Sequence, residues 1–376
     1  MRHSAPRSLG TLSRFDCAVP NLAQPPAMPD SDHKKLSIRP SRVTRDDVAR
    51  HAQVSTAVVS YVINNGPRTV APETRRRVEE AIAALGYFPN TIARSLRSDQ
   101  SNTIGLILPS LTDLECAEIA SDLQSICHDE GYLVVLCASE RDVSSEERAI
   151  GMLRNHQVDG VVILPTQDSP ALLRSLLFAG VPTVVIDRYL PNAHSITVDD
   201  SAGGRMGTEH LLALGHRRIG MLLQDVERTT GSERLLGYSQ ALAGRQIAHD
   251  DRLIMRSAPT AADAYDAMWQ LLRLAQPPTA ILTDTYAISL GAMRAIYQAG
   301  LRIPDDISVV GYGASSLAAT FAPPLTTVQC APFTLGQVAA QKVLRLATRD
   351  DNASASASIL PVALVRRDST APLRRG

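Results

Sequence analysis

The sequence predicts an α/β protein with a small helix-turn-helix module near its N-terminal end and two linked α/β subdomains behind it. Three observations support this division. Residues 43–97 combine apolar positions at helical spacing with capping residues and a tight turn. From Ile104 onwards, short apolar runs alternate with amphipathic helical stretches. Positive charge is concentrated in the first of these two segments.

The N-terminal module is predicted to contain three short helices. Thr44 can cap the first helix, with Asp47 placed to complete a capping box, and Ser55 can cap the second. The third helix begins at Pro72 and stops at Gly86. In the second helix the apolar positions at helical spacing are Val58, Val59 and Val62. They leave a free face of small and polar side chains: Thr56, Ala57, Ser60 and Tyr61.

The charge of this module is unusual for the chain. Residues 34–97 contain twelve lysines and arginines but only five acidic residues, an excess of seven, whereas the whole chain has a net charge of zero. A neutral protein with such a local excess has the electrostatic footprint of a phosphate-binding module. The alternative is a packing module with no nucleic-acid role. Within the run Arg75–Arg77, we expect one or two side chains to neutralise phosphates, and a purely solvated face is the other interpretation.

The remainder of the chain predicts parallel sheets that are covered on both faces. The apolar runs lie at residues 104–109, 133–138, 160–165, 183–187, 195–199, 219–223, 279–284, 307–312 and 326–329. This is a large number of strands for one sheet, so two linked subdomains are expected. A low-complexity loop at 350–358 precedes a last strand near 359–365.

Composition limits the classes of protein that remain. The hydrophobic content of 44% supports a real core, and no run of eighteen apolar residues predicts a membrane span. Residues 1–41 have no periodic pattern and no apolar signal region, so we expect a disordered extension in a cytoplasmic protein. Met28 is an alternative translation start. The five cysteines are scattered and form no CxxC, which suits reduced thiols better than disulfides or a metal site.

Catalysis is poorly supported, and no cofactor is expected. The chain has no GxxxxGK[ST], HExxH or GxSxG motif. Gly203, Gly204 and Gly207 do not form GxGxxG, and we interpret them as glycines that permit close packing. A dehydrogenase is therefore the weaker hypothesis. A secreted solute-binding protein, or an orphan sensor whose cleft binds a metabolite without gene regulation, is the other alternative.

Linked motifs along the chain point to one family. The N-terminal segment contains DVA, VS-x-x-x-VS, VINN, V-x-PETR-x-RV, LGY-x-PN and IARSLR, in that order. The later part contains VDGVVILP, GVPTVVIDR, VDD-x-AGG, LGHRRIG, AGLRIPDDISVVGY and PPLTTV. Over about Val43 to Ala371 the sequence resembles the LacI/GalR family of transcriptional repressors. The resemblance implies a homodimer that binds a palindromic DNA operator and a small-molecule effector, without a membrane.

The resemblance also implies a division of the chain. The headpiece takes residues 42–89, and a hinge helix with its linker takes 90–102. The core, 103–376, has the periplasmic-binding-protein type I fold, with two Rossmann-like subdomains, three crossovers and a ligand cleft. Its N-subdomain takes about 103–200 and 330–350, and its C-subdomain takes about 201–329 and 351–376.

The family's functional positions can be carried over residue by residue. In the headpiece, Thr56, Ala57 and Tyr61 would meet base edges and Ser60 would contact phosphate. Arg68, beyond the helix, would reach either the DNA backbone or a base. In the hinge helix, the implied residues are the wedge Leu96 and its neighbours Ala93 and Arg97. In the cleft they are Arg228, Thr230, Arg234, Asp187 and Asp284, with Arg188 beside Asp187. Alternatively, each of these charged residues could form an ion pair that stabilises the fold and does not contact a ligand.

The sequence departs from the family in the cleft. The family's aromatic pair is replaced by 114–116 (Leu-Glu-Cys), and Gly313 stands where an acidic residue is usual. Asp284 lies about two residues out of frame, with Tyr286 nearer the family position. A remaining unpaired arginine would favour an anionic ligand, such as a carboxylate or phosphate ester, over a neutral sugar. That expectation stays open because Glu115, Asp187 or Asp284 could turn inward and neutralise the arginines, leaving a vestigial cleft.

Overall fold

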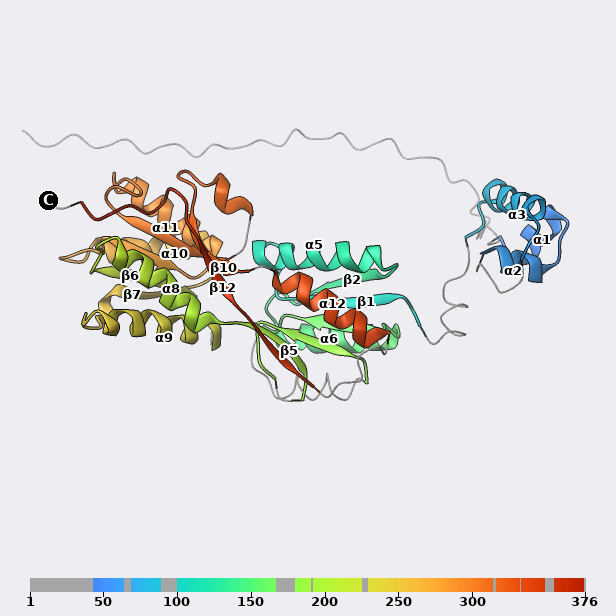
Figure 1. The fold of residues 1–376 in the computed structure, drawn as a ribbon, viewed down its shortest axis with the longest axis horizontal. Helices are drawn as coiled ribbons and strands as arrows, with labels where there is room; N and C mark the ends of the chain where they lie inside the picture. The colour runs from blue at the N-terminus through green and yellow to red at the C-terminus, as the bar shows by residue number, and fades with distance from the viewer. Residues whose placement is uncertain are drawn as a thin grey trace, which may run out of the picture. The chain divides into compact units, whose positions relative to one another are not determined.

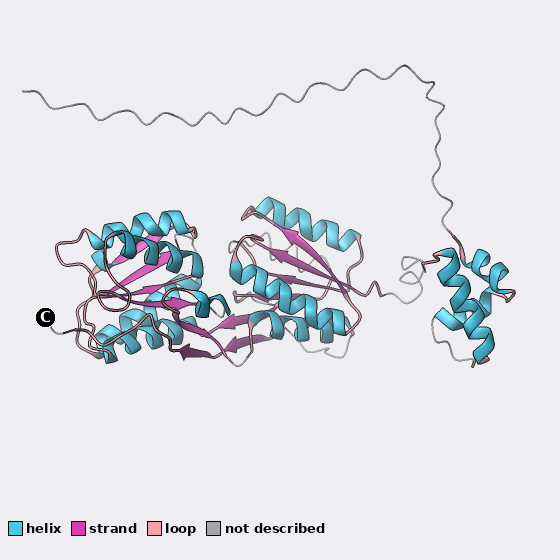
Figure 2. Cartoon of the chain, turned by 90° about the horizontal axis from the view of Figure 1, so that it is seen from above, coloured by secondary structure: helices cyan, strands magenta, loops and turns pink. Residues whose placement is uncertain are grey.

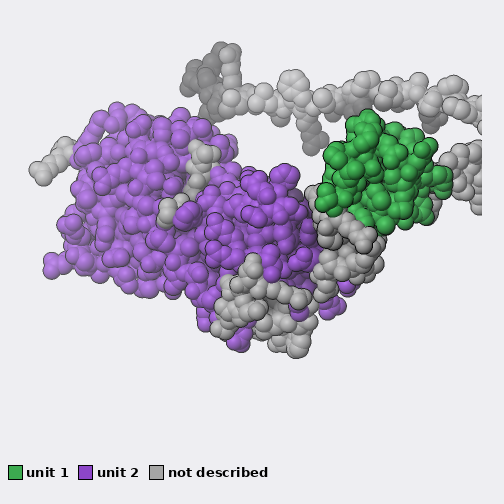
Figure 3. Space-filling model, turned by 45° about the vertical axis from the view of Figure 1, so that its right-hand side comes forward, with its two compact units in different colours: residues 1–89 green, residues 90–376 purple. Residues whose placement is uncertain are grey.

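The computed structural model describes residues 43–63, 69–88, 100–166, 180–190, 192–224, 229–313, 316–331, 333–348 and 355–374. The chain forms two compact units, residues 1–89 and residues 90–376 (Figure 3). Within the described residues, no helix is long and apolar enough to span a membrane.

The first unit is the three-helix module that the sequence predicts. Its helices are α1 (Arg45–Ala52), α2 (Thr56–Ile63) and α3 (Pro72–Leu85). The capping box of Thr44 and Asp47 is present, and Gly86 ends α3 in the left-handed conformation with φ 60°. Val48, Val59 and Val78, one from each helix, are completely buried together. Local capping and apolar spacing therefore place these helices correctly.

The second unit contains two six-stranded sheets (Figure 1). The first sheet has the order β11-β5-β4-β3-β1-β2, and all its neighbouring strands are parallel. Its strands are β1 (Thr103–Leu108), β2 (Leu133–Ala138), β3 (Gly160–Ile163), β4 (Thr183–Ile186), β5 (His194–Val198) and β11 (Ala357–Leu360). The helices that the structure describes in this subdomain are α5 (Leu114–Asp129), α6 (Val143–Asn155) and α12 (Leu335–Ala347).

The second sheet has the order β12-β10-β9-β8-β6-β7. Only its edge pair β10–β12 is antiparallel. Its strands are β6 (Ile219–Gln224), β7 (Ile254–Ser257), β8 (Ala280–Thr283), β9 (Ser308–Tyr312), β10 (Thr326–Cys330) and β12 (Val362–Val365). The helices are α8 (Asp200–Ala213), α9 (Thr229–Gly244), α10 (Ala261–Leu272) and α11 (Tyr286–Gln298), with short 3-10 turns η1 (Asp251–Leu253) and η2 (Ser316–Thr320).

Helices cover both faces of each sheet (Figure 2). In the first subdomain α5 and α12 pack on one face and α6 packs on the other. In the second, α8 and α9 share one face, while α10 and α11 share the opposite face. The central parallel strands β1, β3, β4, β8 and β9 are buried on both sides, and they appear in the sequence as continuous apolar runs.

The chain crosses between the two subdomains three times. The crossings follow β5, β10 and β11. β5 and β11 belong to the first sheet and β10 belongs to the second, and each of these strands is followed by an element of the other subdomain. The structure differs here from the sequence-based division, which gave 351–376 to the C-subdomain. Residues 357–360 pair with β5 in the first sheet. Pro361 divides the expected strand 359–365 into β11 and β12, because proline has no N–H to donate to a ladder.

One strand, β7, was not predicted from the sequence. β7 is a short edge strand with only two apolar residues, Ile254 and Met255, and three of its four side chains remain partly or largely exposed. β7 therefore lacks the continuous apolar run by which the other strands were predicted.

Candidate functional site

The free face of α2 is the candidate nucleic-acid surface of the headpiece. Thr56 and Ala57, in the first turn of the helix, are exposed, whereas Ser60 and Tyr61 are half-buried. Val59 and Val62 point into the headpiece core. The helix therefore separates an apolar buried side from the small and polar residues that the sequence assigned to base edges. Arg68, Ala93, Leu96 and Arg97 lie outside the described residues.

The arginines of α3 differ in their pairing. Arg76 donates to Glu73 at 2.6 Å and to Glu80 at 2.7 Å, and these contacts with Arg76 lower the pKa of Glu73. Arg75 lies 3.8 Å from Glu79. Arg77 makes no ion pair with a described residue, and its buried Nε has no hydrogen-bond partner there.

A large cavity lies between the two subdomains of the core. Its volume is about 1000 Å³. The first subdomain contributes the loop after β1, the start of α5 and Arg141, while the second contributes the face of α11 and η2. The inner wall contains Tyr286, Met293 and Tyr312, all buried, and the Tyr286 ring lies 6.5 Å from that of Phe321. Aromatic side chains thus do line the cleft, although they come from positions other than 114–116.

A second, much smaller pocket of about 40 Å³ shares Glu115 and Tyr312 with the large cavity. It contains Asp187, whose backbone is left-handed with φ 62°, and Gly313. Its complete lining is Glu115, Glu118, Ile119, Asp122, Asp187, Val198, Arg234, Tyr312, Gly313, Gln329, Cys330, Thr334 and Leu335. Of the cleft positions carried over from the family, Asp187 and Arg234 line this smaller pocket.

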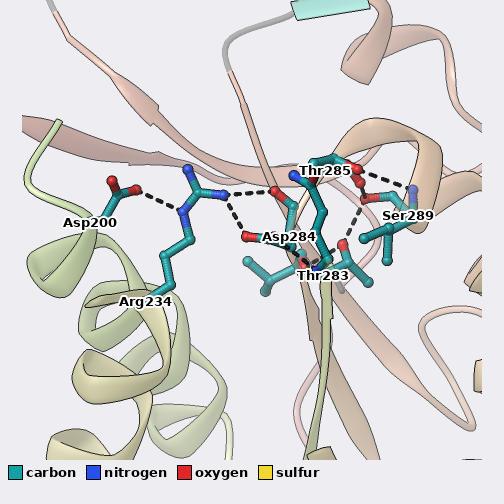
Figure 4. Close-up of polar contacts among 9 residues, drawn as sticks. Asp200, Arg234, Thr283, Asp284, Thr285 and Ser289 are labelled. Atoms are coloured by element: carbon teal, nitrogen blue, oxygen red, sulfur yellow. Dashed lines mark hydrogen bonds and ion pairs between the residues drawn. The ribbon is translucent and has the colours of Figure 1, made fainter. Parts of the chain in front are cut away.

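Arg234 is held by the protein's own carboxylates (Figure 4). Its Nε donates to Asp200 Oδ1 at 2.7 Å, and its Nη1 donates to Asp284 Oδ1 at 2.5 Å and to the Asp284 carbonyl at 2.9 Å. The guanidinium carbon lies 3.7 Å from the centre of the Tyr312 ring. All four residues are buried, with exposed fractions of 4–7%. A guanidinium bound in this way has most of its donors already satisfied.

This pairing removes the reason for expecting an anionic ligand, which was an arginine without a partner in the cleft. Arg234 is not left unpaired, because Asp284 turns toward it, as the open alternative allowed, and Asp200 joins from the start of α8. Burial would by itself lower the pKa of Arg234, but Asp200 and Asp284 raise it well above its usual value. Burial raises the pKa of Asp200, and the neighbouring Arg234 offsets this only in part, since one cation serves two buried carboxylates.

The turn from β8 into α11 fixes Asp284. The backbone N–H of Gln224 donates to Asp284 Oδ2 at 3.1 Å. Behind it, the hydroxyls of Thr283 and Ser289 lie 2.6 Å apart, and the Ser289 hydroxyl donates to the Thr285 carbonyl (Figure 4). These bonds hold the end of the strand and the first turn of the helix together, so Asp284 keeps its orientation toward Arg234.

Glycines bring α8 and α9 close enough for the pairing. A Cβ added to Gly204 would lie 2.0 Å from the Arg234 carbonyl oxygen, and one added to Gly203 would lie 2.2 Å from the Tyr312 hydroxyl. No side chain fits at either position, which confirms the interpretation of these glycines as packing residues. Their absence of side chains lets Asp200 and Arg234 approach across the two helices.

The remaining predicted cleft residues are dispersed. Arg228 lies outside the described residues. Thr230 is in the first turn of α9 and lines neither cavity. Arg188 is buried and donates to the Thr166 carbonyl at 3.2 Å. Asp200 and Tyr312 were missed as partners of Arg234, although both stand in quoted motifs, VDD-x-AGG and SVVGY, because spacing alone does not show which side chains meet.

Comparisons with known proteins agree with this architecture. Residues 44–90 match the family described as bacterial regulatory proteins, lacI family, and residues 208–370 match the periplasmic binding protein-like domain. The chain is 34% identical over 313 residues to the HTH-type transcriptional repressor PurR of Haemophilus influenzae (strain PittEE), covering 82% of this chain and 92% of that protein. It is 36% identical over 315 residues to PurR of Pectobacterium atrosepticum, with the same coverages.

Solved structures show the same similarity. The lac repressor dimer bound to operator and the anti-inducer ONPF has 32% identity and a TM-score of 0.78, covering 88% of this chain and 99% of that chain. The complex of the transcriptional regulator CelR with cellobiose has 30% identity and a TM-score of 0.66, covering 87% and 100%.

Proposed function

Because this chain belongs to the LacI family of bacterial regulatory proteins and is a DNA-binding repressor with an effector-binding domain, we propose that it acts in the cytoplasm as a homodimer on a near-palindromic operator. Two copies related by a twofold axis present two α2 helices to two half-sites. An effector in the cleft between the subdomains changes the affinity for the operator. No catalysis and no cofactor enter this function.

The observation that carries the proposal is the exposed first turn of α2. Thr56 and Ala57 are accessible there, while Val59 and Val62 anchor the helix from behind. Ala57 offers only a methyl group, which suits contact with a thymine methyl, so polar base recognition falls to Thr56 and Tyr61. Within residues 90–102, the resemblance assigns the minor-groove wedge to Leu96, between Ala93 and Arg97.

Exposed apolar side chains on the core support the homodimer. Leu290, Tyr297 and Leu317, on α11 and η2, form the outer rim of the large cavity and are each about half exposed. Leu133 and Leu136 are exposed on β2, an edge strand of the first sheet. A second copy that covers both subdomains would bury these residues. The structure of the lac repressor dimer on its operator gives a precedent among similar proteins.

The test is a selection of duplexes from a random library by the full-length protein, followed by titration of the enriched sequence at several salt concentrations. We expect an inverted repeat to be enriched and the affinity to fall steeply with salt, since each neutralised phosphate releases counterions. Thr56→Ala should weaken discrimination at one base pair of each half-site by about 1–3 kcal/mol. Enrichment of no sequence would show that the α2 face does not read DNA.

A further inference from the structure

The large cavity between the two subdomains is lined mainly by apolar and aromatic side chains. Its volume of about 1000 Å³ lies at the upper end of the range of about 300–1000 Å³ that is usual for small-molecule sites. Tyr286 and Met293 of α11 are buried in its inner wall, and Phe321 packs against the same hydrophobic cluster. The cavity therefore has room and apolar surface for a whole metabolite.

The aromatic side chains of this wall can receive a further ring. The ring centres of Tyr286 and Phe321 lie 6.5 Å apart, and the two planes are inclined by 40°. Aromatic rings attract one another in offset or tilted arrangements with their centres about 4.5–7 Å apart. Phe321 is half-buried and lines the cavity, so part of its ring surface remains available to a ligand.

The charges of the lining balance each other. Among the described residues that line the cavity, the charged ones are two acids, Asp113 and Glu115, and two bases, Arg141 and Arg294. Arg141 pairs with Asp113 at 3.3 Å, and the guanidinium carbon of Arg294 lies 5.1 Å from the centre of the Tyr265 ring. A charged ligand would lose its hydration here without meeting an excess of opposite charge, so the lining favours a neutral one.

Several hydroxyl groups of the lining are engaged within the protein. The hydroxyls of Ser110 and Thr112 lie 3.0 Å apart, and the Thr285 hydroxyl caps α11. The Tyr297 hydroxyl donates to the Ala322 carbonyl. A sugar needs a hydrogen-bond partner for each hydroxyl that it buries, and it would compete with these internal bonds. The polar groups of the cavity therefore suit a ligand with few hydroxyls.

Leu114 brings the first subdomain into the same site. It is the first residue of α5, within the segment that replaces the family's aromatic pair, and it packs against the cluster of Tyr286 and Met293 in the second subdomain. A ligand between Leu114 and that cluster contacts both subdomains, so its affinity depends on how they close on each other. Aromatic surface is thus supplied from the second subdomain, and the first subdomain supplies an aliphatic contact.

We propose that the effector of this repressor is a neutral aromatic compound, with its ring against Phe321 and Tyr286 and an opposite edge against Leu114. This inference rests on the proposed function of the cleft as the effector site. It replaces the anionic ligand that the sequence suggested, because the arginine on which that expectation depended is paired internally. The ligand wall is distinct from the half-exposed rim that a second copy would cover, which consists of Leu290, Tyr297 and Leu317.

The test uses ligands of similar shape that differ in aromaticity and charge. The probes are 2-naphthol, its saturated analogue decahydro-2-naphthol, 2-naphthoate and 2-naphthylmethylamine, with glucose as a ligand rich in hydroxyls. Calorimetry and thermal shift are measured on the full-length protein. We expect 2-naphthol to bind once per chain and to raise the melting temperature. The saturated and charged analogues should bind more weakly by about threefold or more, and glucose should not bind.

Two substitutions probe the two walls of the site. Phe321→Leu keeps an apolar side chain but removes the ring, so it should weaken 2-naphthol binding about threefold to tenfold and leave the saturated analogue nearly unaffected. Leu114→Ala removes the contact from the first subdomain and should weaken both bicyclic alcohols by about threefold or more. Phe333→Leu and Leu236→Ala are the matched controls, because both side chains are exposed and line neither cavity. Both controls should bind like the wild type.

Operator binding is measured on the same samples with and without 2-naphthol, and we expect the ligand to change the affinity for the operator. The inference is overturned if 2-naphthol does not bind, if it binds without changing operator affinity, or if the saturated analogue, a charged analogue or glucose binds as tightly. It is also overturned if the controls weaken binding as much as the cavity variants do.

Sedimentation of Phe321→Leu separates the ligand wall from the contact between copies. Weaker dimerisation of this variant with unchanged 2-naphthol binding would assign Phe321 to the partner copy and overturn the inference. Intact operator binding without any response to 2-naphthol defeats only this inference, whereas loss of operator recognition by the wild type defeats the proposed function.

Discussion

The headpiece and the core use their arginines in opposite ways. Arg76 in the headpiece is exposed and pairs with acids three and four residues away on its own helix. Arg234 in the core is buried and pairs with acids 34 and 50 residues away on other elements. Exposed pairs of the first kind contribute little to stability, because water competes for both charges. In buried pairs of the second kind, removal of one partner leaves the others as uncompensated buried charges, which strongly destabilises the fold.

The largest expected effect is that of Arg234→Ala. The substitution leaves Asp200 and Asp284 buried beside each other without a cation, so we expect the core to lose about 3–5 kcal/mol of unfolding free energy. Urea denaturation of the full-length protein, followed through the core transition, measures the loss.

Arg205→Ala, an exposed position on α8, is the control and should leave that transition unchanged. A similar stability for Arg234→Ala and the wild type would mean that the cluster is not formed as described, and would remove the contrast between the two regions.

The second effect concerns the close contact of α8 with α9. Gly204→Ala places a Cβ against the Arg234 backbone, where no flexible side chain can move aside, so we expect a loss of about 1–3 kcal/mol. A Cβ added to Gly151 on α6 would meet no atom within 4 Å, and Gly151→Ala should instead stabilise its helix by about 0.5–1 kcal/mol. Thermal unfolding of the two variants therefore gives shifts of opposite sign. Equal shifts would contradict the close approach.

The smallest effect concerns a buried carboxyl in the first subdomain. Glu146 is fully buried, and its Oε1 accepts from the Thr166 backbone at 2.6 Å while Oε2 has no partner among the described residues. Burial raises the pKa of Glu146 above its usual value of 4.5, despite the bonds from Thr166. The folded protein therefore holds this proton more tightly than the unfolded chain does. Its contribution to stability is complete below pH 4.5 and is lost as pH rises through the raised pKa.

Glu146→Gln keeps the acceptor for Thr166 and removes the titration. We expect the variant to gain stability relative to the wild type as the pH rises from about 4.5 toward neutrality, with no gain at lower pH. Unfolding curves at several pH values measure this difference. The exposed neighbour Glu147→Gln should show no such trend, and a pH-independent difference for Glu146→Gln would refute the raised pKa.

The same contrast explains what could be predicted from the sequence. The cap of Thr44 on α1, the stop at Gly86 and the buried strands depend on residues close together in the chain or on continuous apolar runs, and these were predicted correctly. The edge strand β7 and the pairing of residues 357–360 with β5 depend on a neighbour in the sheet. The cluster around Arg234 depends on three elements meeting in space. Motif spacing identified Arg234 and Asp284 but could not show that they bind each other.

The central claim is that two copies of this repressor bind one operator through two α2 helices. Analytical sedimentation of the full-length protein with a fluorescent duplex that carries the selected site measures the number of chains on each DNA molecule. We predict two chains per duplex, and two chains per particle in the absence of DNA at the same protein concentration. One chain bound per duplex, at protein concentrations that saturate the site, would contradict the account.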